Sequence, residues 1–136
     1  MVDHHEFHDG LFEGFQVEGA ELRVFLRTVD GKGFIACANQ LEALAAGGFR
    51  PGNIIVEVLV REHTEVTPAD IAELYDLPQD PDRGVQIERL LANVNRLQLK
   101  IFEINPSHGG MLLALAGALT FETRNTTFKH NLEASS

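Results

Sequence analysis

Tryptophan is absent from the chain, and cysteine and tyrosine each occur once among its 136 residues. The lone Cys37 excludes an internal disulfide and gives no reason to expect an oxidising compartment. Its apolar surroundings, residues 34–38, predict a buried and inert thiol, because a reactive thiol needs an exposed, positively charged environment. Since Tyr75 is the only tyrosine, we expect no aromatic platform for sugars or nucleobases.

Positive charge is also scarce. The chain has 11 lysines and arginines against 20 aspartates and glutamates, which gives a formal net charge of −9. Nucleic-acid backbones and anionic membranes are bound by clustered basic residues. We therefore predict no nucleic acid and no membrane as a partner, and an acidic surface that keeps the protein soluble.

Long hydrophobic runs are missing as well. The longest, residues 111–119, is about half as long as a helix that spans a bilayer. The first six residues are polar and acidic, and they lack the pattern of a signal peptide. These features predict a cytoplasmic protein.

Signatures of catalysis are absent too. The chain contains no Gly-x-Ser-x-Gly motif, no His-Glu-x-x-His motif and no glycine-rich phosphate loop. Ser107 is the only serine before the C-terminal tail, and adjacent residues such as Ser107 and His108 seldom face each other as nucleophile and base. The sequence favours a non-enzymatic protein, leaves the question of an enzyme open, and predicts no cofactor.

What is present is strong β-structure. Residues 53–61 contain five β-branched side chains, and the preceding Arg50-Pro51-Gly52 predicts a type II turn. Alternation places the even-numbered residues of this strand on a core-facing side and the odd-numbered ones on a partly covered side.

The chain before this strand also predicts β-structure. Residues 11–17 form a first strand, with Gly14 as a bulge, and residues 21–29 form a second. The turn 30–33 is typical of a hairpin, with residues 34–38 as its return strand.

For three further segments the sequence predicts the secondary structure with different clarity. Residues 40–49 are ambiguous, and we expect one irregular turn of helix or an edge segment. Residues 97–105 return to β-structure and lead into a turn at 105–110. Residues 111–123 fit a strand or a helix, and we favour the strand because the preceding turn is hairpin-like.

Two helices are predicted between these strands. The first begins at Thr67 as N-cap, with Pro68 at its first position and Asp70 near the positive end of its dipole. The second follows the acidic cap at residues 80–83. Its core-facing stripe comprises Ile87, Leu90, Leu91 and Val94.

The pattern as a whole predicts a single α+β domain over residues 1–136. We expect an antiparallel β-sheet of about six strands, with two helices inserted between the fourth strand and the C-terminal hairpin. Residues 1–10 and 125–136 are expected to be loosely ordered.

Candidate ligand-binding residues occur in two places. The N-terminal cluster 4–9 contains metal-ligand types, and a zinc site there would need a distant residue such as His108 or His63. Glycines beside His108 leave room for a ligand. The candidates are His8, Asp9, Asn105 and His108. The alternative interpretation is a solvated arm and an ordinary turn, and whether any metal binds stays open.

Three segments, His8-Asp9-Gly10, Phe49 to Ile55 and Phe102 to Gly109, resemble small uncharacterised bacterial proteins. Some of those are similar to contact-toxin immunity proteins. The resemblance covers most of the chain in outline, and its motifs are turn and strand patterns. It implies an α+β domain with a sheet-rich body and a protein partner, and it brings no catalytic residues.

The leading hypothesis is a cytoplasmic, non-enzymatic module that binds a protein, with an acidic surface that complements a basic partner. A strand edge available for self-pairing would also fit a homodimer. The alternative is a small metal-dependent enzyme or ligand-binding protein that uses His8, Asp9 and His108. That alternative requires these three side chains to converge.

Overall fold

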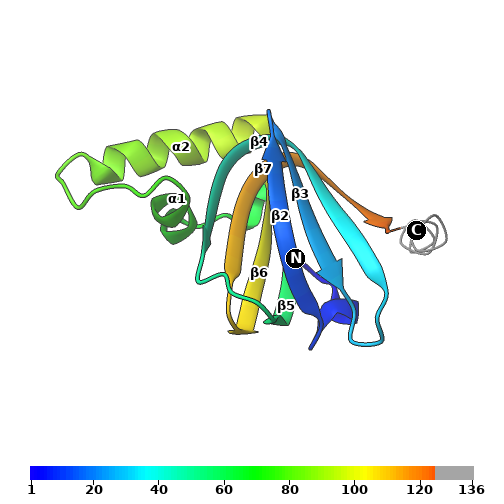
Figure 1. The fold of residues 1–136 in the computed structure, drawn as a ribbon. Helices are drawn as coiled ribbons and strands as arrows, with labels where there is room; N and C mark the ends of the chain where they lie inside the picture. The colour runs from blue at the N-terminus through cyan, green and yellow to red at the C-terminus, as the bar shows by residue number, and fades with distance from the viewer. Residues whose placement is uncertain (125–136) are drawn as a thin grey trace.

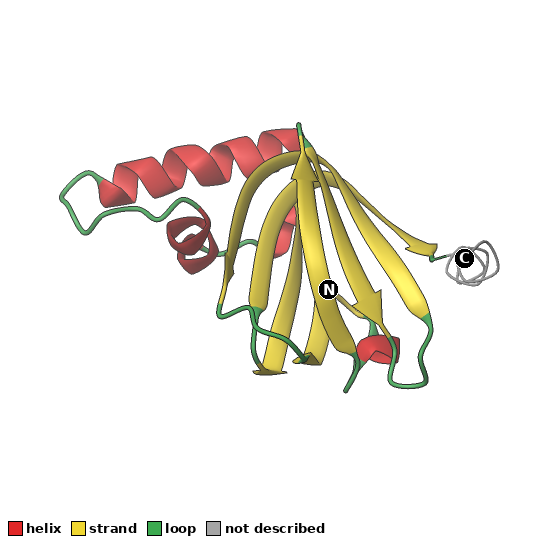
Figure 2. Ribbon diagram, in the orientation of Figure 1, coloured by secondary structure: helices red, strands yellow, loops and turns green. Residues whose placement is uncertain are grey.

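Residues 1–124, which a computed structural model describes, form seven strands and two α-helices (Figures 1 and 2). The strands are β1 (Val2–Asp3), β2 (Leu11–Glu18), β3 (Glu21–Arg27), β4 (Gly33–Gly47), β5 (Asn53–Arg61), β6 (Lys100–His108) and β7 (Met111–Thr123). The helices are α1 (Pro68–Leu74) and α2 (Arg83–Leu97), and the short 3-10 turns are η1 (His5–Phe7) and η2 (His63–Glu65). No helix in this part of the chain is long and apolar enough to cross a membrane. The loosely ordered tail expected over residues 125–136 lies outside the described residues.

Six of the strands close into an antiparallel barrel. They follow the order β5-β2-β3-β4-β7-β6, β6 pairs back onto β5, and β1 adds to β5 as a further strand. The predicted α+β fold, an open sheet with two inserted helices, is therefore wrong: the structure is mostly β. Alternation identifies strands, but it does not show the long-range pairings β2–β5 and β5–β6 that close the sheet.

Several local predictions are confirmed. Strand β5 spans residues 53–61, and β2 carries a register shift between Phe12 and Gly14. Strands β3 and β4 form the predicted hairpin around residues 28–32, and residues 111–123 are a strand.

Strand β4 corrects the interpretation of residues 40–49. It is 15 residues long and pairs with β7 along most of its length, with one bulge between Leu41 and Ala43. The expected turn of helix is wrong, whereas the alternative of an edge segment is confirmed, because residues 41–47 pair with β7 and with no other strand in the described chain. After the bulge both faces of β4 are covered, because Leu44 packs into the barrel whereas Ala43 and Ala45 pack toward the helices. Burial on both faces removes the alternation that would have identified a strand.

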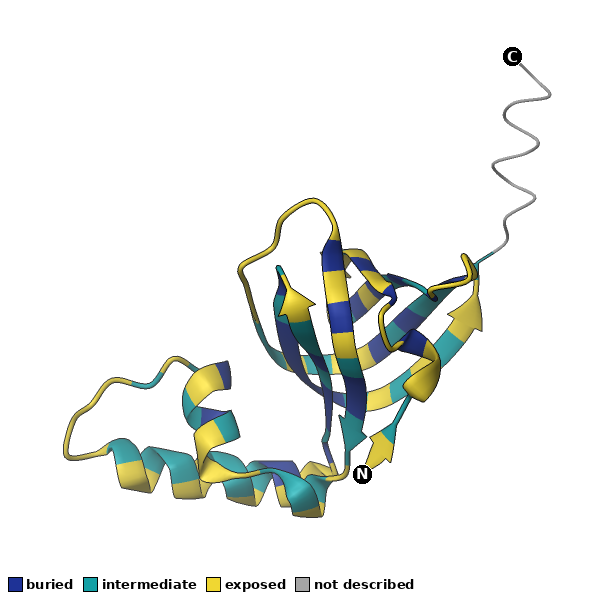
Figure 3. Ribbon diagram, turned by 90° about the horizontal axis from the view of Figure 1, so that it is seen from below, coloured by how far each residue is buried: buried dark blue, intermediate teal, exposed yellow. Residues whose placement is uncertain are grey.

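Two hydrophobic cores lie on opposite sides of the barrel wall. The fully buried large side chains of the barrel interior include Phe7, Phe12, Leu22, Val24, Leu26, Ile55, Val58, Ile104 and Leu112. The second core lies between the helices and the outer face of β6 and β7, and includes Ile71, Leu74, Val94, Leu99, Ile101, Leu113 and Leu115. Buried and exposed residues accordingly alternate along much of the barrel wall (Figure 3).

Strand β5 does not keep one face toward the core. Ile55 is fully buried, whereas Ile54 and Val56 are each more than a third exposed. The register with β6 shifts between Ile55 and Glu57, and beyond this bulge Val58 is fully buried. The prediction of a single core-facing set is wrong at the start of the strand because the bulge exchanges its two faces.

The N-terminal segment is packed, contrary to the loose order expected for residues 1–10. Strand β1 pairs with β5, and the backbone N–H of His4 donates to the Val58 carbonyl at 2.9 Å. Phe7 is fully buried, with its ring edge-to-face against Phe34 at 5.3 Å between centroids and 6.0 Å from Phe121. Turn η1 lies at one end of the barrel (Figure 2), and Phe7 fills that end.

The helices begin and pack largely as predicted. Thr67 and Asp70 form a reciprocal capping box at α1, with Pro68 in the first turn. In α2, Val94 is buried and the rest of the predicted stripe packs partly buried against the second core. The acidic cap of α2 is wrong, because the Asp82 side chain makes no capping hydrogen bond.

Arg61 ties α1 to the barrel. Its guanidinium donates two hydrogen bonds to the Asp70 carboxylate, at 2.7 and 2.8 Å, and one to Glu103 on β6 at 3.1 Å. Burial tends to raise the pKa of Asp70, but the hydrogen bonds from Arg61 and Thr67 outweigh it, so this pKa lies below its usual range.

Replacement of the N-terminal aromatic plug tests the packing of the barrel end. We expect Phe7→Ala to lower the free energy of unfolding by about 3–5 kcal/mol, because it leaves a cavity among fully buried side chains. Urea denaturation measures the loss. The control is His5→Ala in the same turn, whose side chain is 85% exposed and should have little effect. Equal stability of the two variants would contradict the packing described.

Removal of the Arg61 guanidinium tests the anchoring of α1. We expect Arg61→Ala to cost about 1.5–2 kcal/mol at neutral pH, the lower part of the range for charged hydrogen bonds because the site is partly exposed. A lowered pKa stabilises the fold above the unfolded-state pKa of Asp70, and that stabilisation is lost as the pH falls through the folded-state value. The difference from the wild type should therefore shrink in acid. Arg23→Ala, which breaks the exposed pair with Glu21, is the control and should change little.

Candidate binding surface

His8 and Asp9 lie beside β5. The Nδ1 atom of His8 is 2.6 Å from the Val56 carbonyl oxygen, and the backbone N–H of Asp9 donates to the Ile55 carbonyl at 2.9 Å. Both side chains are more than 60% exposed, with 3.8 Å between His8 Nε2 and an Asp9 carboxylate oxygen. Asp9 has a φ of 62°, in the left-handed region.

Asn105 and His108 lie within β6 and not in a turn. Asn105 donates to a carboxylate oxygen of Glu57 at 3.0 Å, and His108 is an exposed residue at the end of the strand, opposite Ile54. The predicted turn at 105–110 shortens to the two glycines between β6 and β7.

The four predicted residues do not converge. His8 and Asp9 contact β5 on the edge where β2 begins, whereas His108 pairs with its other edge. Strand β5 therefore lies between them. In residues 1–124 no three His, Cys, Asp or Glu side chains are grouped to hold a metal ion. A ligand-binding role for His8, Asp9, Asn105 or His108 stays a prediction, and their convergence on a metal finds no support in the geometry.

Cys37 lies partly exposed on the outer face of β4, so the predicted full burial is wrong. Its neighbours Ala36 and Ala38 face the barrel interior instead. Burial raises the pKa of the Cys37 thiol, and the negative charges of Glu122 and Glu21 raise it further. The thiol is therefore protonated at neutral pH, as expected of an unreactive cysteine.

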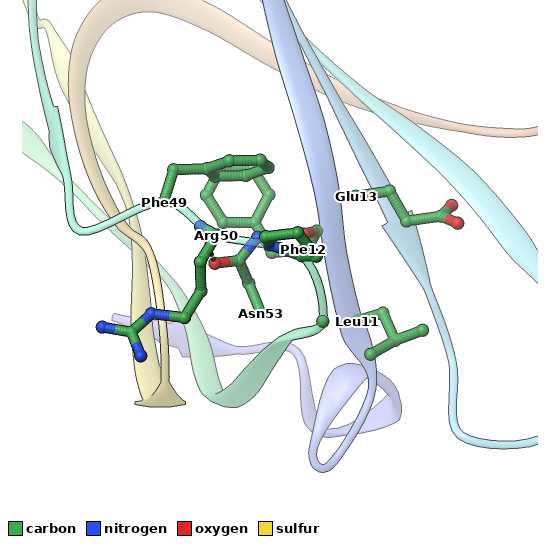
Figure 4. A pocket seen from close by; sticks show the side chains of 8 residues that line it. Leu11, Phe12, Glu13, Phe49, Arg50 and Asn53 are labelled. Atoms are coloured by element: carbon green, nitrogen blue, oxygen red, sulfur yellow. Dashed lines mark hydrogen bonds between the residues drawn. The ribbon is translucent and has the colours of Figure 1, made fainter.

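A shallow cavity opens where β2 separates from β5. These strands share only two residue pairs, Leu11 with Ile54 and Phe12 with Asn53, and β2 then extends past the start of β5. The cavity of about 220 Å³ is lined by residues 11–13 of β2 and the turn 49–53 (Figure 4). It is smaller than the roughly 300–1,000 Å³ of small-molecule sites. Its size suits a single side chain better than a cofactor.

Asn53 closes the floor of this cavity. Its side chain is 2% exposed and makes three hydrogen bonds. Its Oδ1 atom accepts from the backbone N–H groups of Arg50 at 2.8 Å and Gly110 at 2.7 Å, and its Nδ2 atom donates to the Phe12 carbonyl at 3.2 Å. One amide thus joins β2, the turn before β5 and the β6–β7 turn.

Three phenylalanines form a cluster above it. The ring of Phe49 lies edge-on to Phe12 at 5.2 Å and to Phe15 at 6.5 Å between centroids, and it covers Phe12 in Figure 4. Phe12 is buried, but Phe15 is 38% exposed and Phe49 is 48% exposed. Val17, two residues further along β2, is 46% exposed. Large apolar side chains thus stay half-exposed along one strand.

The same part of β2 has a free edge. Residues 14–18 pair with β3 on one side, Glu13 is the bulged residue, and none of residues 13–18 pairs with another strand among residues 1–124. Residues 41–47 of β4 likewise pair only with β7. The two free edges lie on either side of the same opening in the barrel wall. At one end of this opening the Leu41 N–H donates to the Ala20 carbonyl, and at the other end Asn53 donates to the Phe12 carbonyl. In Figure 1, β7 and β6 are seen between β2 and β4. We call residues 13–18 of β2, together with Phe49, the β2 edge site.

Unpaired negative charge lies at the C-terminal end of β2 in this site. Glu18 stands directly opposite Glu21 in the β2–β3 ladder, an unfavourable like-charge pair that Arg23 relieves on the Glu21 side only. Glu42 is also exposed, but it lies on the helix side of β4, where burial, helped by this charge, raises the pKa of Tyr75. Within residues 1–124, neither Glu18 nor Glu42 has an ion-pair partner.

At the other end the carboxylate is satisfied. Glu13 binds Arg27 at 3.2 Å and Arg124 at 2.6 Å. Arg50 has no ion-pair partner among residues 1–124, but Figure 4 shows its side chain pointing away from the cavity. The unmatched carboxylate of the site is therefore Glu18.

The sequence indicated the strand and the turn here but not the site. The alternation of Phe15 and Val17 with polar residues marks a two-faced strand, and Asn53 was predicted as a turn residue. The signal that could have helped is the glycine pair at 109–110, since glycines admit a close approach of another chain segment. The sequence did not predict which segment approaches these glycines.

Comparisons with protein families, curated proteins and solved structures find no match to the chain. The resemblance to small bacterial proteins of the immunity type stays a prediction. The function is therefore argued from the β2 edge site.

Replacement of Asn53 tests its role in closing the barrel. We expect Asn53→Ala to lower the free energy of unfolding by about 2–4 kcal/mol, because it removes a buried hydrogen bond from Gly110, a partly buried one from Arg50 and a buried one to the Phe12 carbonyl. Asn105→Ala, which removes one hydrogen bond from a partly exposed site, is the matched control and should cost about 1 kcal/mol. Chemical denaturation compares the two, and a loss at Asn53 no larger than at Asn105 would rule out the closing role.

Proposed function

We propose that the protein is a non-enzymatic module that binds another protein through the β2 edge site. The observation that carries this proposal is a strand edge without a partner beside half-exposed aromatic side chains. Phe15 and Phe49 keep 38% and 48% of their surface in water in a chain with a net charge of −9. Aromatic residues are enriched in the centres of protein interfaces, where they contribute much of the binding energy.

The small cavity supports the same conclusion. It lies next to the aromatic cluster and has walls from Phe12, Phe49 and Leu11. A partner side chain that entered it would bury part of its apolar surface against these residues. The cavity next to the aromatic cluster thus gives a partner both an anchor and a contact area.

No observation favours the alternative of a metal-dependent enzyme, because β5 separates His8 and Asp9 from His108. We also propose that binding takes place in the cytoplasm, since the lone cysteine fits a reducing compartment.

Capture of partners from a lysate of the encoding organism tests the proposal. We expect the immobilised protein to retain one protein in stoichiometric amount, and the double variant Phe15→Ser, Phe49→Ser to retain at least about tenfold less, because it removes the aromatic contacts.

The matched control is the double variant Val29→Ser, Val85→Ser. These valines are 74% and 57% exposed and lie away from the site, on the β3–β4 turn and on α2. It should capture as much partner as the wild type, and thermal unfolding should show all three proteins folded. If the phenylalanine variant is folded and captures the same proteins as the wild type, the proposal is wrong.

A further inference from the structure

We infer that the partner of the β2 edge site is an extended segment of alternating basic and apolar residues, which adds to β2 as a new strand. This inference rests on the proposed function and specifies what is bound. Three features carry it: the free backbone of β2, the side chains on its inward face, and the charge at its end.

The backbone argument comes first. Residues 13–18 are in extended conformation and residues 14–18 pair with β3, so this part of β2 is held rigid for pairing on its other edge. A free edge presents its N–H and C=O groups in the spacing that another strand requires. The ladder between β2 and β5 ends at the pair Phe12–Asn53, where β5 begins, and this leaves the rest of the β2 edge open.

The side chains specify the apolar half of the pattern. Phe15 and Val17 point to the same face of β2, and Phe49 lies beside Phe15. An added strand presents every second side chain to this face. Those side chains would cover Phe15, Val17 and Phe49, and one would fit the cavity of about 220 Å³. They should therefore be apolar.

The charge specifies the other half. Glu18 opposes Glu21 across the ladder, and of these two carboxylates only Glu21 has an ion-pair partner within residues 1–124. A lysine or arginine on the added strand would lie near these carboxylates and replace a like-charge repulsion by an attraction. The net charge of −9 would also steer a basic segment toward the protein.

A second copy of this chain fits the site less well. Antiparallel pairing of β2 with itself about its centre, between Phe15 and Gln16, would place Glu13 of one copy opposite Glu18 of the other. Glu13 is already bound by Arg27 and Arg124, so this pairing would bring no free positive charge to Glu18. A basic segment would supply that charge, and it therefore fits the edge better than a second copy does.

A synthetic probe tests the inference directly. The probe is a fluorescein-labelled ten-residue peptide of alternating lysine and valine with capped ends, and binding to the full chain is measured by fluorescence anisotropy at low salt. We expect saturable binding, with amide NMR shifts concentrated in residues 13–18 and around Phe49. A peptide of alternating glutamate and valine should not bind.

Backbone methylation separates strand pairing from side-chain contact. Successive N–H groups of a strand point to opposite edges, so N-methylation of all valines blocks one edge and of all lysines the other. We expect one of these two peptides to lose at least tenfold in affinity and the other to bind within about threefold of the parent. If both bind like the parent, strand addition is overturned.

Charge reversal in the protein tests the polar half. Glu18→Lys should weaken binding about three- to tenfold, whereas Glu88→Lys, at an exposed position on α2, should leave it within about twofold. Equal effects of the two would overturn the assigned position of the basic residues. A dimer seen by sedimentation without peptide, and strengthened by Glu18→Lys, would identify a second copy as the occupant and also overturn the inference.

The two proposals fail separately. If capture from the lysate depends on Phe15 and Phe49 while the lysine–valine peptide does not bind, the β2 edge site is a binding surface without strand addition. If capture does not depend on these phenylalanines, the proposed function itself is wrong.

Discussion

The barrel depends on the three hydrogen bonds of the Asn53 side chain. A buried amide must satisfy its donors and acceptors within the protein, and here only the meeting of β2, the turn before β5 and the β6–β7 turn does so. The site also restricts its neighbours. A Cβ at Gly109 would lie 2.3 Å from Asn53 Oδ1, and that residue has a φ of +89°. A glycine is therefore required where the two segments meet.

Closure at this corner also explains the exposed edge. Because Asn53 holds the start of β5 against Phe12, the shared ladder ends after two residue pairs and the rest of β2 extends beyond it. Residues 13–18 keep their backbone groups free on one side, and Phe15 and Phe49 stay 38% and 48% exposed beside the buried Phe12. The interaction that stabilises the fold thus creates the surface that we propose for binding.

The helices lie away from this surface and have a structural part. Arg61 joins α1 to β5 and β6, and the second core covers the outer face of β6 and β7. The β2 edge site is on a different part of the barrel wall, so a partner could bind there without moving the helices. The N-terminal turn with Phe7 closes one end of the barrel, so its part is also structural.

The sequence by itself determined the local elements. Residues 53–61, the cap at Thr67 and the α2 stripe follow from β-branching, capping chemistry and period, which act over a few residues, whereas residues 111–123 fitted a strand or a helix. Only the tertiary structure decided that the sheet closes, that residues 40–49 are strand, that Phe7 is buried and that part of β2 is left unpaired. Those outcomes depend on contacts between segments far apart in the chain, such as Phe12 with Asn53, and periodicity along one segment carries no information about its partner.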